Sequence, residues 1–366
     1  MDIRLENVLE YEQPTKYIVK SENYSDDFAL PVLTAGKSFV LGFTDETDGI
    51  CKALESPVII FDDFTADCKY VDFDFKVKSS AMKILHKANT EDNLKYYFYA
   101  MQAIDYTPFS HKRVWISEYS KFKIKNRSIA EQNNIVKELD TVATAIDNAK
   151  QRLNALDELV KSRFIEMFGD IRISSIFPNI ALENFAQMGS SKRVHAADYV
   201  ESGVPFYRSK EIIELGNGQE PSVELFISKK QYESIKKTNG VPCKGDILMS
   251  AVGTIGKMWI VDGRKDFYYK DGNIISIHSE ETNPIYLKEA LANLIDDFKS
   301  ANVAGSAYSA LTIVKLKKMT VPMPPMSIQN EFADFVKLID KSKFIVQKQI
   351  DDLQELLDSK MDEYFG

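Results

Sequence analysis

The residues with the clearest capacity for chemistry are basic and hydroxyl side chains in loop-like stretches of the second half of the chain. Residues 190–193, 207–210 and 254–257 each combine them with turn-forming neighbours. Arginine and lysine donate hydrogen bonds to guanine O6 and N7 or to phosphate, and tyrosine, serine and threonine bind phosphate. The pattern favours a nucleic-acid contact surface, with ordinary solvated surface charge as the alternative. The candidates are Ser191, Lys192, Arg193, Tyr207, Arg208, Lys210, Thr254 and Lys257.

The first half of the chain offers an analogous set. Residues 111–113 align, at an offset of 197 residues, with residues 308–310 inside the segment Gly-Ser-Ala-Tyr-Ser-Ala-Leu. That segment is either a phosphate or base contact or a simple turn. The additional candidates are Thr34, Lys37, Thr65, Lys69, His111, Lys112, Arg113, Ser306 and Tyr308.

Acidic residues suggest a second kind of chemistry. Asp62 or Asp63, followed on the next expected strand by Asp74 and Lys76, resembles the acidic pair and lysine of metal-dependent nucleases. Such carboxylates bind Mg²⁺ and activate a water molecule. Acidic residues beside an alternating strand are common by chance, and the second half has no equivalent set. A metal-dependent nuclease is therefore kept as an alternative.

Other catalytic and metal-binding patterns are missing from the sequence. Gly253 and Gly256 precede Lys257 without the spacing of a phosphate-binding loop. Four scattered histidines give no zinc pattern, and three cysteines without CxxC spacing predict reduced thiols in a cytoplasm. We expect no catalytic residue, no metal and no cofactor in this chain.

Composition limits the class of protein. With 366 residues, 44% of them hydrophobic and 27% charged, the chain is long enough for two or three domains. No apolar run approaches the roughly 20 residues that a membrane span needs, and the acidic, polar N-terminus does not read as a signal peptide. The formal net charge of −8 excludes a stand-alone basic DNA-binding protein. Phosphate contacts would have to come from local patches or from a partner subunit.

Two matching helical stretches, residues 128–170 and 327–366, must position the loops. At the offset of 197, Gln132 and Asn133 fall on Gln329 and Asn330. Both stretches lack glycine and proline before their ends. About 30 helical residues at about 1.5 Å each give a rod of about 45 Å. Each stretch carries a heptad stripe: Leu139, Val142, Ile146, Ala149, Leu153, Leu156 and Val160 in the first, and Val336, Ile339, Lys343, Val346, Ile350, Leu353 and Leu357 in the second.

A heptad stripe needs a partner helix to bury it. We therefore predict that the two helices pack on each other; two amphipathic helices, each packed on its own domain, are the alternative. Both helices are acidic, with net charges of −3 for residues 129–170 and −4 for residues 326–366. Their outer faces are the expected docking surface for a partner.

The remaining residues form two mixed α/β units. In the first we expect a buried strand at residues 58–61, a half-buried strand over 69–77 and a helix within 90–105. In the second we expect strands within 245–251, 257–262 and 273–278. A helix should begin after Asn283, with Pro284 in its first turn.

Several segments carry a resemblance to a known family. They are residues 57–65 (PVIIFDDFT), 69–73 (KYVDF), 244–250 (KGDILMS), 253–256 (GTIG) and 321–325 (VPMPP), followed by Ile328 and Gln329 and by the Phe-Gly that closes each rod. Together, in this order and duplicated, they resemble the specificity subunit of type I restriction-modification systems, across essentially the full chain. The first copy lacks the proline-rich lead before its helix.

The resemblance implies an α+β fold (mixed α/β) in which two long antiparallel coiled-coil helices join two globular target recognition domains as a pseudo-twofold internal repeat. The expected domains are residues 1–128 and 171–325, with conserved helical spacers at 129–170 and 326–366. It further implies binding of double-stranded DNA at a bipartite asymmetric site. Two methyltransferase (modification) subunits, which methylate adenine, and restriction subunits in the full complex are the implied partners.

The physical features agree with this interpretation. A rod of about 45 Å spans roughly 13 base pairs at about 3.4 Å per pair, which would leave a gap between two half-sites. The sequence contains no Asn/Asp-Pro-Pro-Tyr/Phe motif and no glycine-rich loop suited to S-adenosylmethionine, so methyl transfer is expected in another chain. A coiled-coil scaffold that does not bind DNA is the third possibility.

Overall fold

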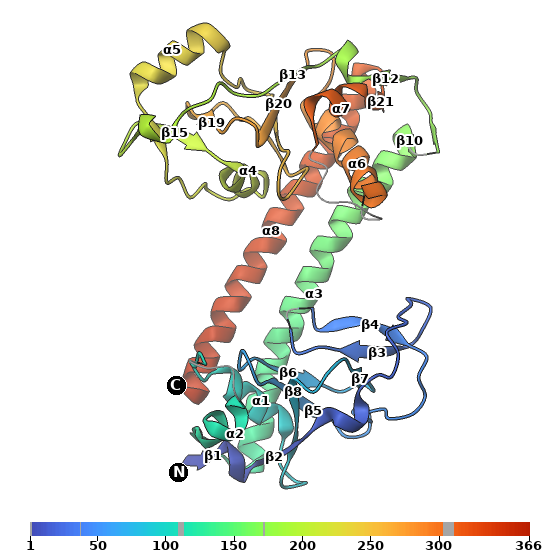
Figure 1. Cartoon of the computed structure of the whole chain (residues 1–366), viewed down its shortest axis with the longest axis vertical. Helices are drawn as coiled ribbons and strands as arrows, with labels where there is room; N and C mark the ends of the chain where they lie inside the picture. Colours follow the sequence, from blue (N-terminus) through green and yellow to red (C-terminus); the bar gives the residue numbers. More distant parts are fainter. Residues whose placement is uncertain (1, 37, 109–112, 171–172, 303–310) are drawn as a thin grey trace. The chain divides into compact units, whose positions relative to one another are not determined.

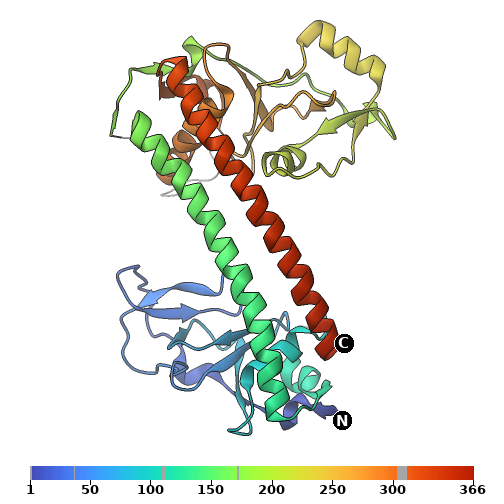
Figure 2. The same cartoon turned by 180° about the vertical axis from the view of Figure 1, so that it is seen from behind.

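The computed structural model describes residues 2–36, 38–108, 113–170, 173–302 and 311–366. Figures 1 and 2 show the chain from opposite sides. It divides into two compact units, Met1–Gln151 with Gln347–Gly366, and Arg152–Val346. Each unit combines helices with sheets, which confirms the mixed class expected from the sequence. No helix in the described ranges is long and apolar enough to cross a membrane.

The first unit contains a four-stranded antiparallel sheet in the order β2-β8-β5-β6 and a smaller sheet in the order β4-β3-β7, in which β3 and β7 are parallel. A separate pair joins β1 to β9. The strands are β1 (Asp2–Arg4), β2 (Leu9–Glu12), β3 (Leu30–Leu33), β4 (Val40–Thr44), β5 (Val58–Asp62), β6 (Cys68–Val71), β7 (Lys76–Val77), β8 (Met82–Lys87) and β9 (Lys123–Lys125). The helical elements are η1 (Leu5–Asn7), η2 (Pro14–Tyr17), α1 (Leu94–Gln102), α2 (Val114–Ser117), η3 (Tyr119–Lys121), the first part of α3 (Ile129–Phe168) and the last part of α8 (Met326–Phe365).

Local sequence explains the central elements of this unit. Strand β5 is a continuous run of buried residues, as expected for a strand covered on both faces. Helix α1 begins where the Asn93 side chain accepts a hydrogen bond from the backbone of Lys95. Its buried residues include Leu94, Tyr97 and Met101, at helical spacing. The predicted strand at 58–61 and the helix within 90–105 are confirmed.

The prediction of a single strand over residues 69–77 is wrong. The segment forms β6 and β7, which belong to different sheets. The side chain of Lys76 is 1% exposed and pairs with Glu46 at 2.8 Å. Between the strands, Asp74 pairs with Lys52 at 2.8 Å. The alternating pattern of polar and apolar residues continues through the bend between β6 and β7, so it did not reveal the bend. Long-range ion pairs stabilise that bend.

The second unit repeats this plan with more elements. Its strands are β10 (Gly169–Asp170), β11 (Ser174–Ser175), β12 (Asn179–Ala181), β13 (Gln187–Gly189), β14 (Tyr199–Val200), β15 (Val204–Tyr207), β16 (Phe226–Ile227), β17 (Ile247–Ser250), β18 (Met258–Ile260), β19 (Tyr268–Tyr269), β20 (Ile274–His278) and β21 (Thr320–Pro322). Its helical elements are η4 (Leu182–Asn184), η5 (Ala196–Asp198), α4 (Ser209–Gly216), α5 (Lys229–Asn239), α6 (Pro284–Asn302), α7 (Ile313–Lys318) and the remaining parts of α3 and α8. All three predicted strands are present as β17, β18 and β20, and the predicted helix as α6.

The main sheets of the two units correspond strand by strand, and the smaller sheets share a parallel pair. The sheet β13-β20-β17-β18 is antiparallel throughout, as is β2-β8-β5-β6. The smaller sheet of the second unit, β14-β16-β15-β19, contains one parallel pair, β15 with β19, as β3 pairs with β7 in the first. The pair β12–β21 corresponds to β1–β9.

A set of buried hydrogen bonds is also duplicated. Gln132 and Gln329 are each 1% exposed. In the first unit, the Asn93 backbone N–H donates to Gln132 Oε1 at 2.9 Å, and Gln132 Nε2 donates to the Arg127 carbonyl at 3.1 Å. In the second, the Asn283 N–H donates to Gln329 Oε1 at 2.8 Å, and Gln329 Nε2 donates to the Pro324 carbonyl at 2.9 Å. Each glutamine therefore joins the start of its long helix to the start of a shorter helix of the same unit, α1 or α6.

Within each unit, segments of α3 and α8 lie against one another. In the first unit Glu138 accepts from Lys360 at 2.6 Å and from the Tyr364 hydroxyl at 2.8 Å. In the second, the ring centroids of Phe164 and Phe332 are 5.6 Å apart. Every residue of the two predicted stripes is buried or half-buried. Each unit therefore contains segments of both long helices in contact with one another.

Candidate nucleic-acid interface

Three segments of the second unit meet at one end of its main sheet. Strand β13 ends at Gly189, opposite Ser276 of β20. Strand β20 begins at Ile274, opposite Ser250, the last residue of β17. The backbone N–H of Ala251 then donates to the Asn273 carbonyl at 2.8 Å. The loop after β13, the β17–β18 hairpin and the segment before β20 therefore lie together; we call this end of the sheet the loop edge of the second unit.

Hydrogen bonds fix the loop after β13 to the segment before β20. The Ser190 hydroxyl accepts from the Gly272 N–H at 3.1 Å. The Lys192 N–H donates to the Tyr268 hydroxyl at 2.7 Å, and Arg193 Nε donates to Asp271 Oδ2 at 2.9 Å. Backbone groups take part in two of these bonds, which fix the course of the loop.

The β17–β18 hairpin is equally well defined. The fully buried Ser250 hydroxyl donates to the Thr254 carbonyl at 2.5 Å and accepts from the Lys257 N–H at 3.0 Å. Gly256 has a φ of +81°, and a Cβ there would lie 2.4 Å from Ile295 Cγ2, so the turn requires glycine. Thr254 and Lys257 are exposed at the tip. They are presented by a rigid turn.

Four of the predicted contact residues in this unit are thus exposed at one edge: Lys192, Arg193, Thr254 and Lys257. Ser191 lies in the same loop but is half-buried, and its Oγ has no hydrogen-bond partner among the described residues. Two lysines, one arginine and a threonine form a surface suited to phosphates and base edges.

Arg208 and Lys210 also lie near this edge, since the Lys270 N–H donates to the Tyr207 carbonyl at 2.8 Å. Their charges, however, are engaged. Arg208 pairs with Glu211 at 2.6 Å and Glu224 at 3.0 Å, and these carboxylates raise the pKa of its guanidinium. Lys210 pairs with Glu224 at 3.1 Å. The structure gives both a role in holding α4 in place.

Tyr207 differs from its prediction. Its side chain is 3% exposed and its ring stacks on Phe267 with centroids 4.8 Å apart. Burial raises the pKa of its hydroxyl. The aromatic ring packs in the core of the second unit against Trp259 and Phe267, so its burial contradicts a direct contact with a ligand in this structure.

The first unit has a corresponding loop edge. Asp62, the last residue of β5, lies opposite Met82, the first of β8, and the Lys78 N–H donates to the Leu33 carbonyl at 2.9 Å. These pairings place the start of the loop after β3 and the β5–β6 hairpin at the same end of the strands. Thr34 follows β3 and is half-buried. Thr65 is exposed in the hairpin, where its hydroxyl donates to Asp62 Oδ2 at 2.9 Å.

Two basic residues extend this edge. The Trp115 N–H donates to Asp63 Oδ1 at 2.9 Å, which places the exposed Arg113 near the β5–β6 hairpin. Lys69 lies on β6 and is half-buried, with its ammonium 5.3 Å from the centroid of the Phe39 ring. The remaining predicted contacts, Lys37, His111, Lys112, Ser306 and Tyr308, lie outside the described residues.

The residues of the nuclease alternative do not form a shared site. Asp62 bonds to the Phe64 N–H and to Thr65 within its own turn. Asp63 pairs with Lys83 at 2.9 Å. Asp74 pairs with Lys52, which lowers the pKa of that carboxyl, and Lys76 pairs with Glu46. In the part of the chain that the structure describes, no group of three or more His, Cys, Asp or Glu side chains is placed to hold a metal ion.

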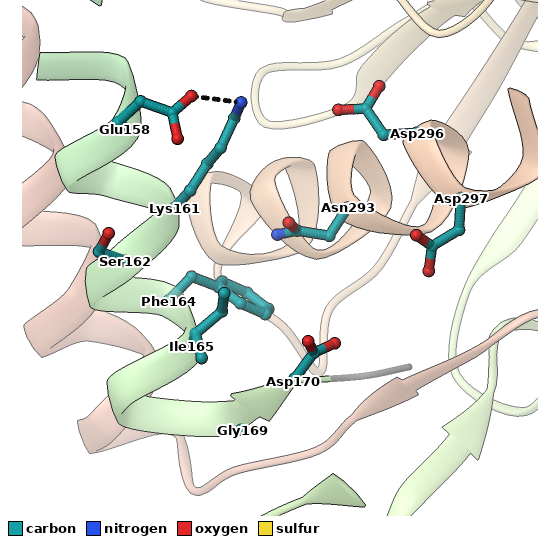
Figure 3. A pocket seen from close by; sticks show the side chains of 10 residues that line it. All are labelled: Glu158, Lys161, Ser162, Phe164, Ile165, Gly169, Asp170, Asn293, Asp296 and Asp297. Carbon is teal, nitrogen blue, oxygen red and sulfur yellow. Dashed lines mark hydrogen bonds and ion pairs between the residues drawn. The ribbon is translucent and has the colours of Figure 1, made fainter. Parts of the chain in front are cut away.

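A pocket of about 280 Å³ lies elsewhere in the second unit, between the end of α3 and helix α6 (Figure 3). Asn293, Asp296 and Asp297 line it from α6, and Asp170 from β10, which follows α3. Lys161 pairs with Glu158 at its rim at 2.8 Å. The lining is polar and rich in carboxylates, so it suits neither a phosphate nor an apolar ligand.

Sequence reasoning missed the segment before β20. Lys270, Asp271 and Asn273 lie at the loop edge, and Asn273 is exposed. The signal was the Asp-Gly pair at 271–272 preceding a predicted strand, which indicates a turn but not what the turn contacts. Pairing of β19 with β15 and of β20 with β17, which brings the segment to the candidate loops, depends on long-range contacts.

Known proteins resemble this chain at the level of sequence. A family model described as the type I restriction modification DNA specificity domain matches residues 179–355. The type I restriction enzyme EcoR124I/EcoR124II specificity subunit of Escherichia coli is 46% identical over 162 residues, which is 41% of this chain and 40% of that protein. The match therefore spans about two-fifths of the E. coli protein's length. A putative type I restriction enzyme specificity subunit of Haemophilus influenzae, S.HindORF215P, is 24% identical over 319 residues, 83% of this chain and 77% of that protein.

Solved structures resemble it at the level of fold. The crystal structure of the S subunit of a type I restriction-modification system from M. genitalium superposes with a TM-score of 0.56 at 15% identity, covering all of this chain and 96% of that one. A chain from a structure describing complex assembly and conformational transition of the type I R-M system superposes with a TM-score of 0.51 at 14% identity, covering 100% and 97%.

Proposed function

Because this chain belongs to the specificity subunits of type I restriction-modification systems, we propose that it guides an adenine methyltransferase and a restriction enzyme to a bipartite DNA sequence. One observation carries the proposal: in each unit, separate segments bring exposed basic and hydroxyl side chains to the same end of an equivalent sheet. Arg193 in the second unit and Arg113 in the first are examples. Loops that are held rigidly and exposed are suited to reading base edges in a DNA groove.

The proposed organisation has two target recognition domains, residues 1–128 and 171–325, each followed by a helical spacer, residues 129–170 and 326–366. The duplicated glutamine contacts and the matching sheet orders support an internal pseudo-twofold repeat. Helices α3 and α8 have 40 residues each, or about 60 Å at about 1.5 Å per residue. In this proposal the paired helices form the antiparallel coiled coil that sets the spacing between the half-sites.

The DNA site should be asymmetric. The second unit carries α4, α5, β14 and β16 beside its loop-bearing sheet, whereas the first carries β4 in the corresponding small sheet. The side chains at the two loop edges also differ, with Thr34 and Thr65 in one and Arg193 and Lys257 in the other. Two different recognition surfaces read two different half-sites.

The methyl transfer is assigned to partner subunits. The acidic residues with the best claim to catalysis, Asp62, Asp63 and Asp74, are each engaged in separate hydrogen bonds or ion pairs. This supports a non-catalytic role for the chain. The proposed partners are double-stranded DNA, two methyltransferase (modification) subunits and, in the complete assembly, restriction subunits.

An exposed apolar patch on α8 supports docking of a partner subunit. Leu338, Phe344 and Ile345 are 62%, 72% and 67% exposed. Large apolar side chains grouped on a surface mark contacts with other proteins. At the equivalent positions of α3, the exposed residues are Thr141, Asp147 and Asn148. The docking surface on α8 is therefore apolar as well as acidic.

Replacing Phe344 and Ile345 by serine is expected to weaken assembly with the modification subunits roughly tenfold or more, since buried aromatic anchors dominate interface energies. Sedimentation analysis of mixtures of the chain with its modification subunits measures this. The matched control replaces Asp147 and Asn148 of α3 by serine and should change assembly little. Unaltered assembly of the α8 variant would remove the patch from the docking surface.

The proposed function is tested by exchanging residues 171–325 for the corresponding domain of another specificity subunit. Methylation sequencing of DNA from cells that express the exchanged chain with its partners should show one new half-site and one unchanged half-site. A change in both half-sites would contradict separate recognition by the two domains.

A further inference from the structure

We infer that Asp271 positions Arg193 to read a guanine in the half-site that the second unit recognises. The inference rests on the proposed function. It adds a recognised base, guanine, a residue that contacts it, Arg193, and a residue that positions that contact, Asp271. Its basis is the geometry of the Arg193–Asp271 pair at the loop edge of the second unit.

Arg193 is exposed yet held in place. Its side chain is 71% exposed, whereas that of Asp271 is 15% exposed. The contact runs from Arg193 Nε to Asp271 Oδ2 at 2.9 Å. Arg193 makes no other ion pair or side-chain hydrogen bond with the described residues, so its two terminal nitrogens remain available. A guanidinium held through Nε presents these nitrogens as a planar fork.

That fork could bind either guanine or phosphate through two parallel hydrogen bonds, and the charge of its neighbour decides between them. Guanine presents two acceptors, O6 and N7, to the major groove, and a bidentate arginine is their commonest specific partner. Phosphate binding depends mainly on positive charge. Because the Asp271 carboxylate offsets the charge of Arg193, attraction to the backbone is reduced, while the two hydrogen bonds to a base edge are retained. The pair therefore favours base recognition.

The segments that carry the two residues are also fixed. Gly272 bonds to Ser190, and Lys192 bonds to Tyr268, so one bond lies next to each member of the pair. Tyr268 itself is 1% exposed. Holding a long side chain in its bound position reduces the conformational entropy lost on binding. Asp271 therefore acts through Arg193, without touching the DNA itself.

Two buried polar atoms beside this pair point to the same site. Ser191 Oγ and Asp271 Oδ1 are buried without a hydrogen-bond partner in the described part of the chain. Buried polar atoms are normally paired, so such exceptions call for a physical explanation. Contact with bound DNA would complete the hydrogen bonding of the Ser191 hydroxyl.

Other arginines of the unit do not meet these conditions. Arg208 has a terminal nitrogen engaged by Glu211 and Glu224. Arg264 is 70% exposed and its Nε pairs with Asp262 at 2.5 Å, so it closely matches Arg193 in type and exposure. It follows β18, however, at the opposite end of the sheet, where Val261 bonds to Asp246 at the start of β17. Arg264 is therefore the matched control.

The test uses the chain assembled with its modification subunits in cells, and methylation sequencing as the readout. Arg193→Ala should make one guanine position of one half-site degenerate, with discrimination falling roughly tenfold or more. Asp271→Ala and Asp271→Asn should weaken discrimination at that same position, and Asp271→Ala should add little once Arg193 is replaced. Arg264→Ala should leave the motif unchanged.

The alternatives give distinct results. A phosphate contact would instead give uniformly weaker methylation at all sites. The slope of log K against log salt concentration, measured for DNA binding in vitro, would also fall by about one unit. That result would overturn the inference. An unchanged motif in the Asp271 variants, or the same loss in Arg264→Ala, would also overturn it. A wild-type complex that methylates no bipartite motif would instead contradict the proposed function. Thermal melting of each variant separates loss of folding from loss of base preference.

Discussion

Replacing Phe332 by alanine is expected to destabilise the second unit by about 3–5 kcal/mol, the usual cost of removing a buried phenyl ring. Phe332 is fully buried. Its ring centroid lies 5.3 Å from that of Phe168 and 5.6 Å from that of Phe164. Phe332 therefore joins the start of α8 to the end of α3 within the unit. The change would leave a cavity among large rings that are themselves held by the helices and by Tyr286. Chemical denaturation of the full chain, compared with wild type, measures the loss.

Phe344→Ala provides the matched control. The two phenylalanines lie on the same helix, but Phe344 is 72% exposed. Its replacement should change the free energy of unfolding of the isolated chain by no more than about 0.5 kcal/mol. Equal losses in the two variants would mean that Phe332 is not the packing centre described.

Replacing Gln132 by leucine is expected to cost the first unit about 2–5 kcal/mol. The leucine has a similar size but leaves the Asn93 N–H and the Arg127 carbonyl without their partner, and each unsatisfied buried polar group costs about 1–3 kcal/mol. Gln329→Leu should do the same in the second unit, through Asn283 and Pro324. A lower denaturation midpoint for each variant is the expected measurement.

The control for this prediction is Gln347→Leu. Gln347 lies on α8 and is exposed, with its amide donating to Asp351 at 2.9 Å. Loss of that surface bond should be close to neutral. If Gln132→Leu proved as mild as Gln347→Leu, the duplicated hydrogen bonds would not be a source of stability.

The long helices were the part of the fold that the sequence predicted best. Their apolar residues recur at spacings of three and four over many turns, and local periodicity is sufficient to identify such a helix. The alignment of Gln132 with Gln329 also anticipated a shared structural role, although it gave no reason for a buried glutamine. The reason is a pair of backbone groups, one of them close in the sequence, at Arg127, and the other 39 residues away, at Asn93.

Elements determined by long-range contacts were predicted less well. The bend between β6 and β7 depends on Lys52 and Glu46, which pair with residues of that segment from more than twenty positions away. Tyr207 was assigned to the surface because arginine and lysine follow it, yet the parallel pairing of β15 with β19 buries its ring. Asp271 was not predicted as a site residue, because its pairing with Arg193 depends on the fold and cannot be identified from the sequence.

The candidate site shows the same division. The sequence identified Arg193, Thr254 and Lys257 by their chemistry, and the structure places their loops at one end of one sheet. It did not distinguish them from Arg208, whose charge is engaged by Glu211 and Glu224. Residue type thus indicates which side chains are able to contact DNA, while their partners in the fold determine which remain available.

Sequencing of methylated adenines in DNA from cells that express this chain with its modification subunits tests the central claim most directly. The two recognition surfaces predict a motif made of two different defined parts, separated by a run of unspecified bases of constant length, with methylated adenine in both parts. A single uninterrupted motif, a variable separation between the parts, or methylation that is independent of this chain would contradict the account.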